Sequence, residues 1–376
     1  MKVVFVCGSI ERGCDGVGDY TRRLAQSLLS KGHDVSIIAM LDSFVIEQKR
    51  EIVETEFGEI KILRLPINIG IKRSSLLLKN EINEINPDWI SLQFVIFAFH
   101  KKGLPFGLGN LLSEAFNGRR LQIMFHELWL GIDKGSNMKY AIWGFMQKRI
   151  VTSLLHKLKP SIVHANSDWY ATQLKKITSN VKVLPLFSNI PVVQEFYQKN
   201  RTTKLLNSNS INFVVFGHIS LFAPVEAFVK ELESIAQKYT IDFSITFIGK
   251  NNSDLDRWTA AWKPKFKINV LGIQSEFVVS KFLSQANIGI STTPYALIGK
   301  SGSFFALQDH GLPVINVSDL SELPEERKRI RAAKGLYEYT IGNLEHILDS
   351  LELPENTKQL DNTRELFLND LLHSNK

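Results

Sequence analysis

A glycine-rich segment at 8–21 follows the first apolar run of the chain and contains Gly16, Val17 and Gly18. Glycine allows a ligand to come close to the backbone, and the amino end of a helix attracts anions. We expect a helix to begin near Tyr20, so this segment is a candidate contact for the diphosphate of a ligand. A flexible turn is the alternative. The spacing does not meet the dinucleotide fingerprint and excludes a P-loop.

The segment 299–303 is the second candidate phosphate site. It places Lys300, Ser301, Gly302 and Ser303 before a helix that we expect over 304–310. One cation, two hydroxyl groups and the backbone N–H groups of a helix start are suited to hold a diphosphate. A capped helix with a surface lysine is the alternative.

His126 is the strongest candidate for a catalytic side chain. It directly follows the apolar run 121–125 and therefore stands at the carboxyl end of an expected strand. A structural histidine is the alternative. Glu127 is a second candidate, although a residue next to a strand end can point away from the site. Asp19 either orients a hydroxyl group of an acceptor or caps the helix that follows it.

The elements that must position these residues are apolar runs that alternate with amphipathic runs. This alternation is typical of a doubly wound α/β sheet. The expected strands are 2–7, 34–40, 60–66, 89–95, 121–125, 161–165, 181–186, 211–216, 243–248, 268–271, 288–291 and 313–317. Expected helices between them include 20–30, 74–85, 140–158, 224–239 and 277–285.

The alternation divides the chain into two domains. The segment 197–210 is polar and has no periodicity, so we interpret it as a linker. We expect an N-terminal domain over 1–196, completed by a C-terminal helix at 358–376, and a second domain over 211–357. Ligands of such sheets bind beyond the carboxyl ends of the strands.

With these motifs in this order, the sequence resembles the GT-B glycosyltransferases of family 4. The motifs that carry the resemblance are 16–28 with 31–35, 87–93, 125–127, 215–218, 247–250, 270–272, 286–294 and 310–315. The resemblance implies two Rossmann-like domains that face a central cleft, and transfer of a sugar with retention of anomeric configuration. It implies that His126 contacts the transferred sugar, and that the glycine segment lies near the donor diphosphate and the acceptor. It also places Gly217, His218 and Lys250 at the nucleotide-sugar site.

The sequence departs from the family pattern at the donor site. The two glutamates that the family carries before its Gly-Leu-Pro motif are replaced by Ile298 and Ala306. Its arginine and lysine after the first strand of the second domain are replaced by His218 and Ala223. The usual contacts to ribose and phosphate are therefore missing, and 299–303 is the expected substitute.

Composition excludes several classes of protein. The 376 residues suit two globular domains, and the two cysteines have no metal-ligand spacing. Neither a signal peptide nor an apolar run of membrane-spanning length is present, so we expect a cytoplasmic protein. No paired acidic ligands stand at a strand end, so we expect no metal and no cofactor; the nucleotide-sugar is a substrate.

Positive charge is concentrated in the first half of the chain. Residues 1–200 hold 26 Lys and Arg against 18 Asp and Glu, whereas residues 201–376 hold 19 against 20. A basic surface favours an anionic partner such as a glycan, lipid-linked or phosphorylated acceptor. The segments 72–78 and 96–109 mix cations with apolar residues, so we consider peripheral contact with the inner face of a membrane, with a buried core edge as the alternative. No stacking motif for nucleic acid is present.

These features predict a metal-independent glycosyltransferase of surface polysaccharide or glycoconjugate biosynthesis. A nucleotide-sugar epimerase and a catalytically inactive binding protein on the same scaffold are the alternatives. The sequence does not identify the sugar, the base, the acceptor or the oligomeric state.

Overall fold

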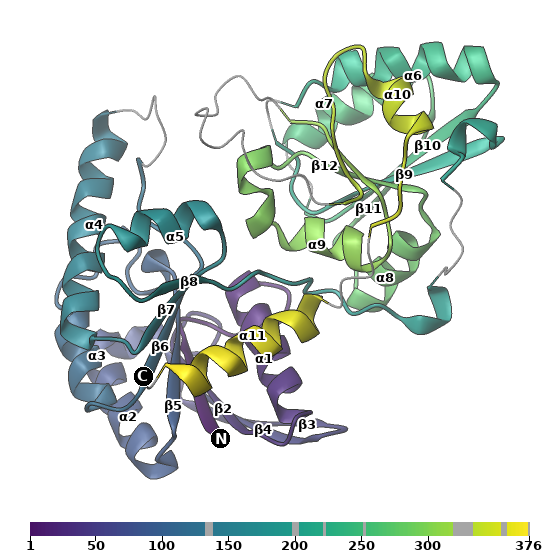
Figure 1. Ribbon diagram of the computed structural model, residues 1–376. Coiled ribbons are helices and arrows are strands. Elements are labelled where there is room, and N and C mark those ends of the chain that lie inside the picture. The colour runs from purple at the N-terminus through teal and green to yellow at the C-terminus, as the bar shows by residue number, and fades with distance from the viewer. Residues whose placement is uncertain are drawn as a thin grey trace. The chain divides into compact units, whose positions relative to one another are not determined.

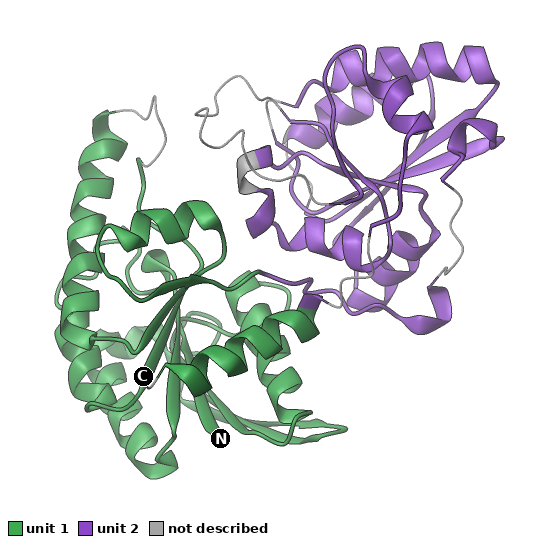
Figure 2. Ribbon diagram, viewed as in Figure 1, with its two compact units in different colours: residues 1–185, 360–376 green, residues 186–359 purple. Residues whose placement is uncertain are grey.

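The chain forms two compact units (Figures 1 and 2). The computed structural model describes residues 1–131, 138–197, 203–220, 223–250, 253–318, 334–354 and 359–374. Unit 1 comprises Met1–Pro185 and Leu360–Lys376, and unit 2 comprises Leu186–Gln359. The chain therefore enters unit 2 earlier than position 197, where we expected the linker to begin. Of the expected linker 197–210, residues 198–202 lie outside the described residues.

Unit 1 is built on a sheet of eight strands, counted over its described residues, in the order β3-β4-β2-β1-β5-β6-β7-β8. Every neighbouring pair is parallel except β3 and β4, which form an antiparallel hairpin. The strands are β1 (Lys2–Cys7), β2 (Asp34–Asp42), β3 (Lys49–Thr55), β4 (Gly58–Pro66), β5 (Trp89–Phe94), β6 (Leu121–Phe125), β7 (Ile162–Ala165) and β8 (Val181–Val183).

Helices cover both faces of this sheet (Figure 1). They are α1 (Gly16–Leu29), α2 (Gly70–Ile85), α3 (Leu108–Phe116), α4 (Met138–Leu158), α5 (Asp168–Lys175) and the C-terminal α11 (Gln359–His373). Even-numbered residues of β1, such as Val4 and Val6, join the core under α2, α3 and α4. On the other face Phe5 stacks on Phe367 of α11, with ring centroids 6.0 Å apart. The last helix of the chain thus completes the core of unit 1.

Unit 2 contains a parallel sheet of six strands in its described part, in the order β11-β10-β9-β12-β13-β14. The strands are β9 (Ser210–Phe216), β10 (Asp242–Ile248), β11 (Lys267–Gly272), β12 (Ile288–Ser291), β13 (Val314–Asn316) and β14 (Leu336–Glu338). The helices are α6 (Val225–Tyr239), α7 (Ser253–Trp262), α8 (Glu276–Gln285), α9 (Gly302–Asp309) and α10 (Leu344–Asp349). Phe213 and Val215 of β9 face one core, and Val214 faces the other. The central strand is therefore buried on both sides, as its continuous apolar run predicted.

The α/β class and the two predominantly parallel sheets are confirmed. Twelve expected strands correspond to strands of the structure, but β3 and β14 were not expected. Three helix starts were wrong: α1 begins at Gly16, not near Tyr20, α2 begins at Gly70, not at Ser74, and α9 begins at Gly302, not at Phe304. In α1 and α9 a polar side chain just before the helix, Asp15 or Ser301, caps the earlier start, whereas α2 has no side-chain cap.

Candidate functional site

The glycine segment of unit 1 continues into the first two turns of α1. Asp15 is the N-cap and accepts a hydrogen bond from the N–H of Val17 at 3.0 Å. A Cβ atom on Gly18 would lie 2.9 Å from Cα of Ile10, so only glycine fits there without movement of the backbone. A Cβ atom on Gly16 would meet nothing within 4 Å. Gly18 therefore serves packing, whereas the space beside Gly16 is open to a ligand.

Asp19 shapes the loop that precedes the helix. Both of its carboxylate oxygens accept hydrogen bonds from the N–H of Gly13, at 3.1 and 3.2 Å. The helix cap that we considered for Asp19 belongs to Asp15 instead. Asp19 lies in the first turn of α1, where a negative charge is favoured by the helix dipole.

Two arginines that the sequence analysis did not select also hold this loop. Arg22 donates two hydrogen bonds to the carbonyl oxygen of Ile10, at 3.0 and 2.7 Å. Arg64 pairs with Glu11 at 2.6 Å and with the fully buried Asp42 at 2.8 Å. Burial opposes the charge of Arg64, but its hydrogen bonds to the two carboxylates raise its pKa above the ordinary value. The loop is therefore positioned by charged contacts to β2 and β4.

His126 directly follows β6 and is only 7% exposed. Its N–H donates to the carbonyl oxygen of Phe94 at 3.1 Å, and its carbonyl oxygen accepts from Nδ2 of Asn166 at 2.9 Å. Its Nε2 lies 2.8 Å from Oε1 of Gln93. The ring of Tyr20, from α1, meets the imidazole edge-on with centroids 4.9 Å apart. The ends of three neighbouring strands and the start of α1 thus converge on His126.

Burial lowers the pKa of His126 to about 3. The imidazole is therefore neutral near neutral pH, so it can form hydrogen bonds with a sugar but cannot supply positive charge. Glu127, the next residue, is exposed. The structure does not bring the Glu127 side chain into the hydrogen bonds that hold His126.

In unit 2, the carboxyl ends of the adjacent strands β9 and β10 lie side by side, and the end of β9 meets the start of α9. Gly217, directly after β9, has φ +91, and a Cβ atom there would lie 3.2 Å from Cβ of Ser303. Gly249, directly after β10, has φ +135, and a Cβ atom there would lie 3.2 Å from the backbone of Gly217. Both conformations favour glycine. Gly217 and Ser303, which we selected from the sequence, therefore lie side by side in space.

Hydroxyl groups line the start of α9. Ser301 accepts from the N–H of Phe304 at 3.2 Å and is the N-cap of the helix. Its Oγ lies 3.0 Å from Oγ of Ser303 and 3.4 Å from Oγ1 of Thr293, which follows β12. The N–H groups of the first helical turn have no acceptor one turn earlier in the helix. Capping is thus a real role of Ser301, and it is compatible with a diphosphate at Gly302 and Ser303.

The remaining candidate side chains of unit 2 stand at the same edge of the sheet. His218 follows Gly217 and is exposed, and Lys250 follows Gly249 and is also exposed. Lys300 is half-buried at the end of a 3-10 helix, η5 (Tyr295–Lys300), that leads into α9. Thr292 donates to the carbonyl oxygen of His218 at 3.3 Å and so joins the strand ends of β9 and β12.

Ile298 and Ala306, which the resemblance to family 4 aligns with its two glutamates, lie in the core of unit 2. Ile298 is 4% exposed and Ala306 is fully buried, and both pack in one apolar cluster with Leu307 and Val314. Ala223, at the position of the family lysine, is also fully buried. At these three positions the apolar side chains fill the space of the core.

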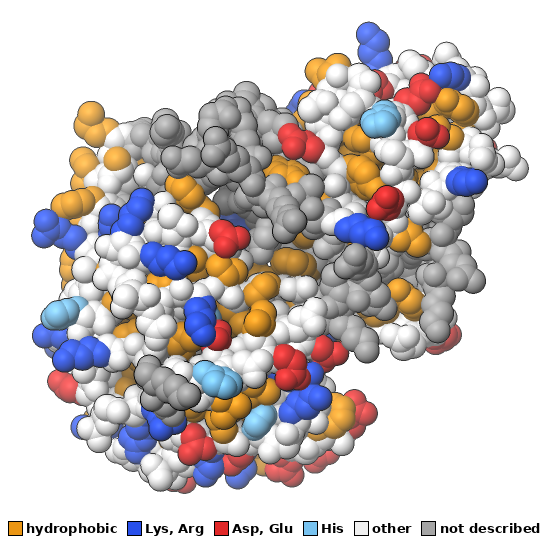
Figure 3. All heavy atoms as spheres, in the orientation of Figure 1, with side chains coloured by type: hydrophobic (Ala, Val, Ile, Leu, Met, Phe, Trp, Pro, Cys, Tyr) orange, Lys and Arg blue, Asp and Glu red, His pale blue; other side chains and the backbone are white. Residues whose placement is uncertain are grey.

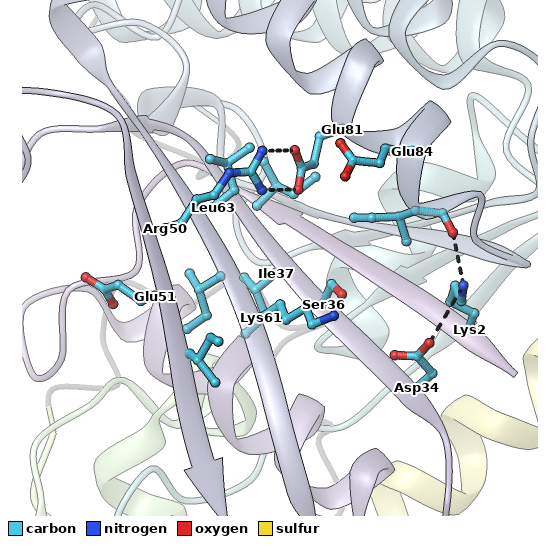
Figure 4. A pocket seen from close by; sticks show the side chains of 14 residues that line it. Lys2, Asp34, Ser36, Ile37, Arg50, Glu51, Lys61, Leu63, Glu81 and Glu84 are labelled. Carbon is cyan, nitrogen blue, oxygen red and sulfur yellow. Dashed lines mark hydrogen bonds and ion pairs between the residues drawn. The ribbon is translucent and has the colours of Figure 1, made fainter.

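A pocket of about 440 Å³ lies elsewhere in unit 1, between α2 and the strands β2, β3 and β4. Figure 4 shows Arg50 of β3 reaching Glu81 of α2, which it meets with two hydrogen bonds of 2.7 Å. Lys2 and Asp34, the first residues of β1 and β2, form an ion pair at its other end. Because the pocket lies toward the amino ends of these strands, it is separate from the strand-end residues described above.

Within the described residues, no cluster of three or more His, Cys, Asp or Glu side chains is arranged to bind a metal ion. The described helices also include none with the length and apolar character needed to cross a membrane.

Comparison with known proteins shows likeness of structure only. No model of a protein family matches the sequence, and no curated protein matches it. An α,α-trehalose-phosphate synthase (UDP-forming) from Burkholderia xenovorans, solved with glucose-6-phosphate, superposes with TM-score 0.61 at 10% identity, covering 99% of this chain and 100% of that one. The UDP-GlcNAc 2-epimerase of Neisseria meningitidis bound to UDP-GlcNAc gives 0.55 at 12% identity over 99% and 100%. WaaG, a glycosyltransferase involved in lipopolysaccharide biosynthesis, gives 0.51 at 11% identity over 99% and 94%.

At such low identity these likenesses establish the fold. The chain has the α/β fold of GT-B glycosyltransferases, matched over nearly its whole length. The same fold is found in sugar-nucleotide epimerases, so the fold does not separate the two kinds of enzyme.

Proposed function

We propose that the protein is a retaining glycosyltransferase, similar to family 4, that moves a sugar from a nucleotide-sugar to a glycan, lipid-linked or phosphorylated acceptor. The observation that carries the proposal is the meeting of Gly217, Gly249 and the start of α9 at the carboxyl edge of the unit 2 sheet. This is the edge where α/β sheets bind nucleotides. The fold matches the proposal, because GT-B glycosyltransferases share it.

In the proposed reaction, unit 2 binds the nucleotide diphosphate. Lys300, the hydroxyls of Ser301 and Ser303 and the first N–H groups of α9 stabilise the negative charge that develops on the leaving group. The reaction uses no bound metal and no cofactor, and it takes place in the cytoplasm.

In this proposal, unit 1 binds the sugar and the acceptor. His126 forms a hydrogen bond with the transferred sugar, and the first turn of α1 at Gly16 lies close to the substrate. Asp19 remains a candidate for orienting the acceptor, and Glu127 remains a second candidate for a catalytic side chain.

Binding of nucleoside diphosphates tests the donor site directly. A ligand that binds the folded protein raises its stability by RT ln(1 + [L]/Kd), so a thermal-shift screen identifies the base. Gly302→Ala tests the diphosphate site without disturbing the fold, because a Cβ atom at this position meets nothing within 4 Å. We expect Gly302→Ala and Lys300→Gln to reduce the shift produced by the diphosphate. Lys263→Gln, at an exposed lysine after α7, is the matched control and should leave it unchanged.

An epimerase is the second candidate, favoured by the likeness to the UDP-GlcNAc 2-epimerase. Incubation of the nucleotide-sugar without any acceptor separates the two. An epimerase converts the sugar under these conditions, whereas a transferase needs the acceptor. Binding of the nucleotide-sugar without turnover in either assay would instead indicate the inactive binding protein, for which the buried Ile298 and Ala306 are the structural argument.

A lipid-linked acceptor would require contact with a membrane surface, and α4 has the features for it. Met138, Ile142 and Phe145 lie on one face of the helix and are 77%, 57% and 58% exposed. The helix contains four Lys and Arg residues and no Asp or Glu. Figure 3 shows apolar and basic side chains intermixed where α4 runs along unit 1. Apolar side chains beside cations are suited to anionic headgroups.

Vesicle co-sedimentation tests this surface. We expect binding to vesicles that contain anionic lipid, and loss of binding in the double variant Ile142→Ser, Phe145→Ser. Ile273→Ser, at an apolar residue of unit 2 that is 77% exposed, is the control. Equal binding of neutral and anionic vesicles would contradict the electrostatic part of the proposal. Of the segment 96–109 considered from the sequence, Phe106 is exposed but Ile96 and Phe99 are buried.

A further inference from the structure

A continuous chain of hydrogen bonds runs from His126 across the sheet of unit 1 to the C-terminal helix. It connects six side chains on β5, β6, β7 and α11, beginning at the residue that follows β6. In order they are His126, Gln93, Ser91, Gln122, His164 and Asp370, with contact distances of 2.8, 2.7, 2.5, 3.0 and 2.9 Å.

The four side chains between His126 and Asp370 in this series of hydrogen bonds are buried. Ser91, Gln122 and His164 have no exposed surface, and Gln93 is 1% exposed. Ser91 and Gln122 are register partners on adjacent parallel strands, so the sheet itself brings them together. Buried polar groups of this kind must be hydrogen-bonded to one another, and a fully satisfied network fixes the orientation of every member.

The carboxylate at the end of the chain determines its direction. An ionised Asp370 can only accept, so Nε2 of His164 must carry the proton that it donates. Burial lowers the pKa of His164 more strongly than Asp370 raises it, so the ring is neutral and its Nδ1 is an acceptor. Nδ1 therefore accepts from the amide nitrogen of Gln122, at 3.0 Å.

The remaining links follow from the first ones. With its nitrogen directed at His164, Gln122 presents its oxygen to the hydroxyl of Ser91. Ser91 then accepts from the amide nitrogen of Gln93, whose oxygen is left to accept from Nε2 of His126. Every donor in the chain thus points toward Asp370. His126 consequently carries its proton on Nε2 and keeps Nδ1 as an acceptor.

We propose that Asp370 on α11 is a positioning residue that fixes the tautomer and orientation of His126 through this one-way chain of hydrogen bonds. The reverse direction would place the His126 proton on Nδ1, and it requires a donor at position 370. A carboxylate cannot supply that donor. The importance of this tautomer for catalysis rests on the proposed function, whereas the tautomer itself does not.

The position of Asp370 is set by contacts of α11 with unit 1. Phe367 stacks on Phe5, Thr363 donates to the carbonyl oxygen of Pro185 at 3.1 Å, and Arg364 donates to the hydroxyl of Ser27 at 3.0 Å. Lys182 binds the second oxygen of Asp370 and lowers its pKa together with His164, against the effect of burial. The carboxylate is therefore both held in place and kept ionised.

Asp370→Asn tests the inference with a change of one functional group. The amide can accept or donate, so both directions of the chain become possible. Nitrogen-15 NMR of histidine-labelled protein distinguishes the two tautomers, and the His126 signals among the nine histidines are identified with His126→Gln. We expect a single Nε2–H tautomer in the wild type and a mixture in Asp370→Asn. Asp361→Asn, which changes the same charge on the same helix, should keep the wild-type spectrum.

Ser91→Ala interrupts the middle of the chain and keeps the test valid if Asp370→Asn does not fold. We expect Ser91→Ala to let His126 populate both tautomers. The double variant Ser91→Ala, Asp370→Asn should show no further change at His126. An unchanged His126 tautomer in both single variants would overturn the inference.

Turnover supplies a second readout. If two tautomers are equally populated and one is active, kcat falls about twofold with KM unchanged. A wild type without transferase activity but with the expected NMR result would refute the proposed function and leave the inference standing.

Discussion

Acidification should destabilise unit 1 through His126. Burial lowers the pKa of this imidazole to about 3 in the folded protein, whereas the ordinary value for histidine is 6.5. Between these two values the unfolded chain binds a proton that the folded one does not, so stability falls as pH decreases. The stability that the neutral His126 contributes is present above pH 6.5 and is lost progressively as the pH falls below this value.

The magnitude follows from the same two values. Between pH 7.5 and pH 5.5, His126 alone should reduce the free energy of unfolding by about 1.4 kcal/mol. In a unit of this size that corresponds to roughly 3–5 °C in Tm. The buried His164, whose pKa is also lowered, adds to the loss in the wild type.

Urea unfolding of the wild type and of His126→Gln at the two pH values measures this contribution. The variant is less stable at pH 7.5, because its side chain no longer fits the contacts with Gln93 and Tyr20, but it should lose less stability on acidification. His156→Gln, at an exposed histidine of α4, should lose as much as the wild type. If His126→Gln and the wild type lost equal stability between pH 7.5 and pH 5.5, the buried neutral imidazole would be refuted.

Substitutions at three places test the packing around the candidate sites. Gly18→Ala should destabilise the protein by roughly 1–3 kcal/mol, because its Cβ meets backbone at 2.9 Å, while Gly16→Ala should be neutral in urea unfolding. Arg64→Met should cost about 3–5 kcal/mol, since it leaves the buried Asp42 without its cation; a double variant with Asp42→Leu should recover part of the loss. Ser301→Ala should lower stability by about 1 kcal/mol through loss of the helix cap, measured as Tm without ligand.

The sequence predicted those parts of the fold that depend on local pattern. The strands β1, β6 and β12 have the expected bounds because each is a short apolar run buried on both faces. β3 was missed because it alternates exposed and half-buried residues and carries charges at four of its seven positions. β14 was missed because it is only three residues long, which is too short for a periodic signal.

The candidate site was predictable to the extent that function follows strand ends. Gly217, His126 and Ser303 could be selected because each directly follows an apolar run or opens a helix. Their partners could not, because those contacts join distant parts of the chain: His164 and Asp370 are 206 positions apart. Polar residues inside apolar strands, such as Gln93, were the available signal for the buried hydrogen-bond network.

The neutral state of His126 has a consequence for the proposed reaction. If this imidazole brings no charge, and the buried Ala223 stands where the resemblance to family 4 implies a lysine, then in the proposed reaction the charge on the leaving diphosphate is balanced by Lys300 and the start of α9.

If unit 2 binds the diphosphate and unit 1 binds the transferred sugar, substitutions in the two units should have different kinetic effects. Lys300→Gln should raise KM for the donor and lower kcat, because the lysine attracts the diphosphate both before and during its departure. His126→Gln should lower kcat with little change in donor KM, since the sugar hydrogen bond contributes little to nucleotide affinity. Steady-state kinetics with varied donor concentration separate the two effects. Equal increases in donor KM for both variants would show that His126 binds the donor in the ground state. That result would contradict the separate roles of Lys300 and His126.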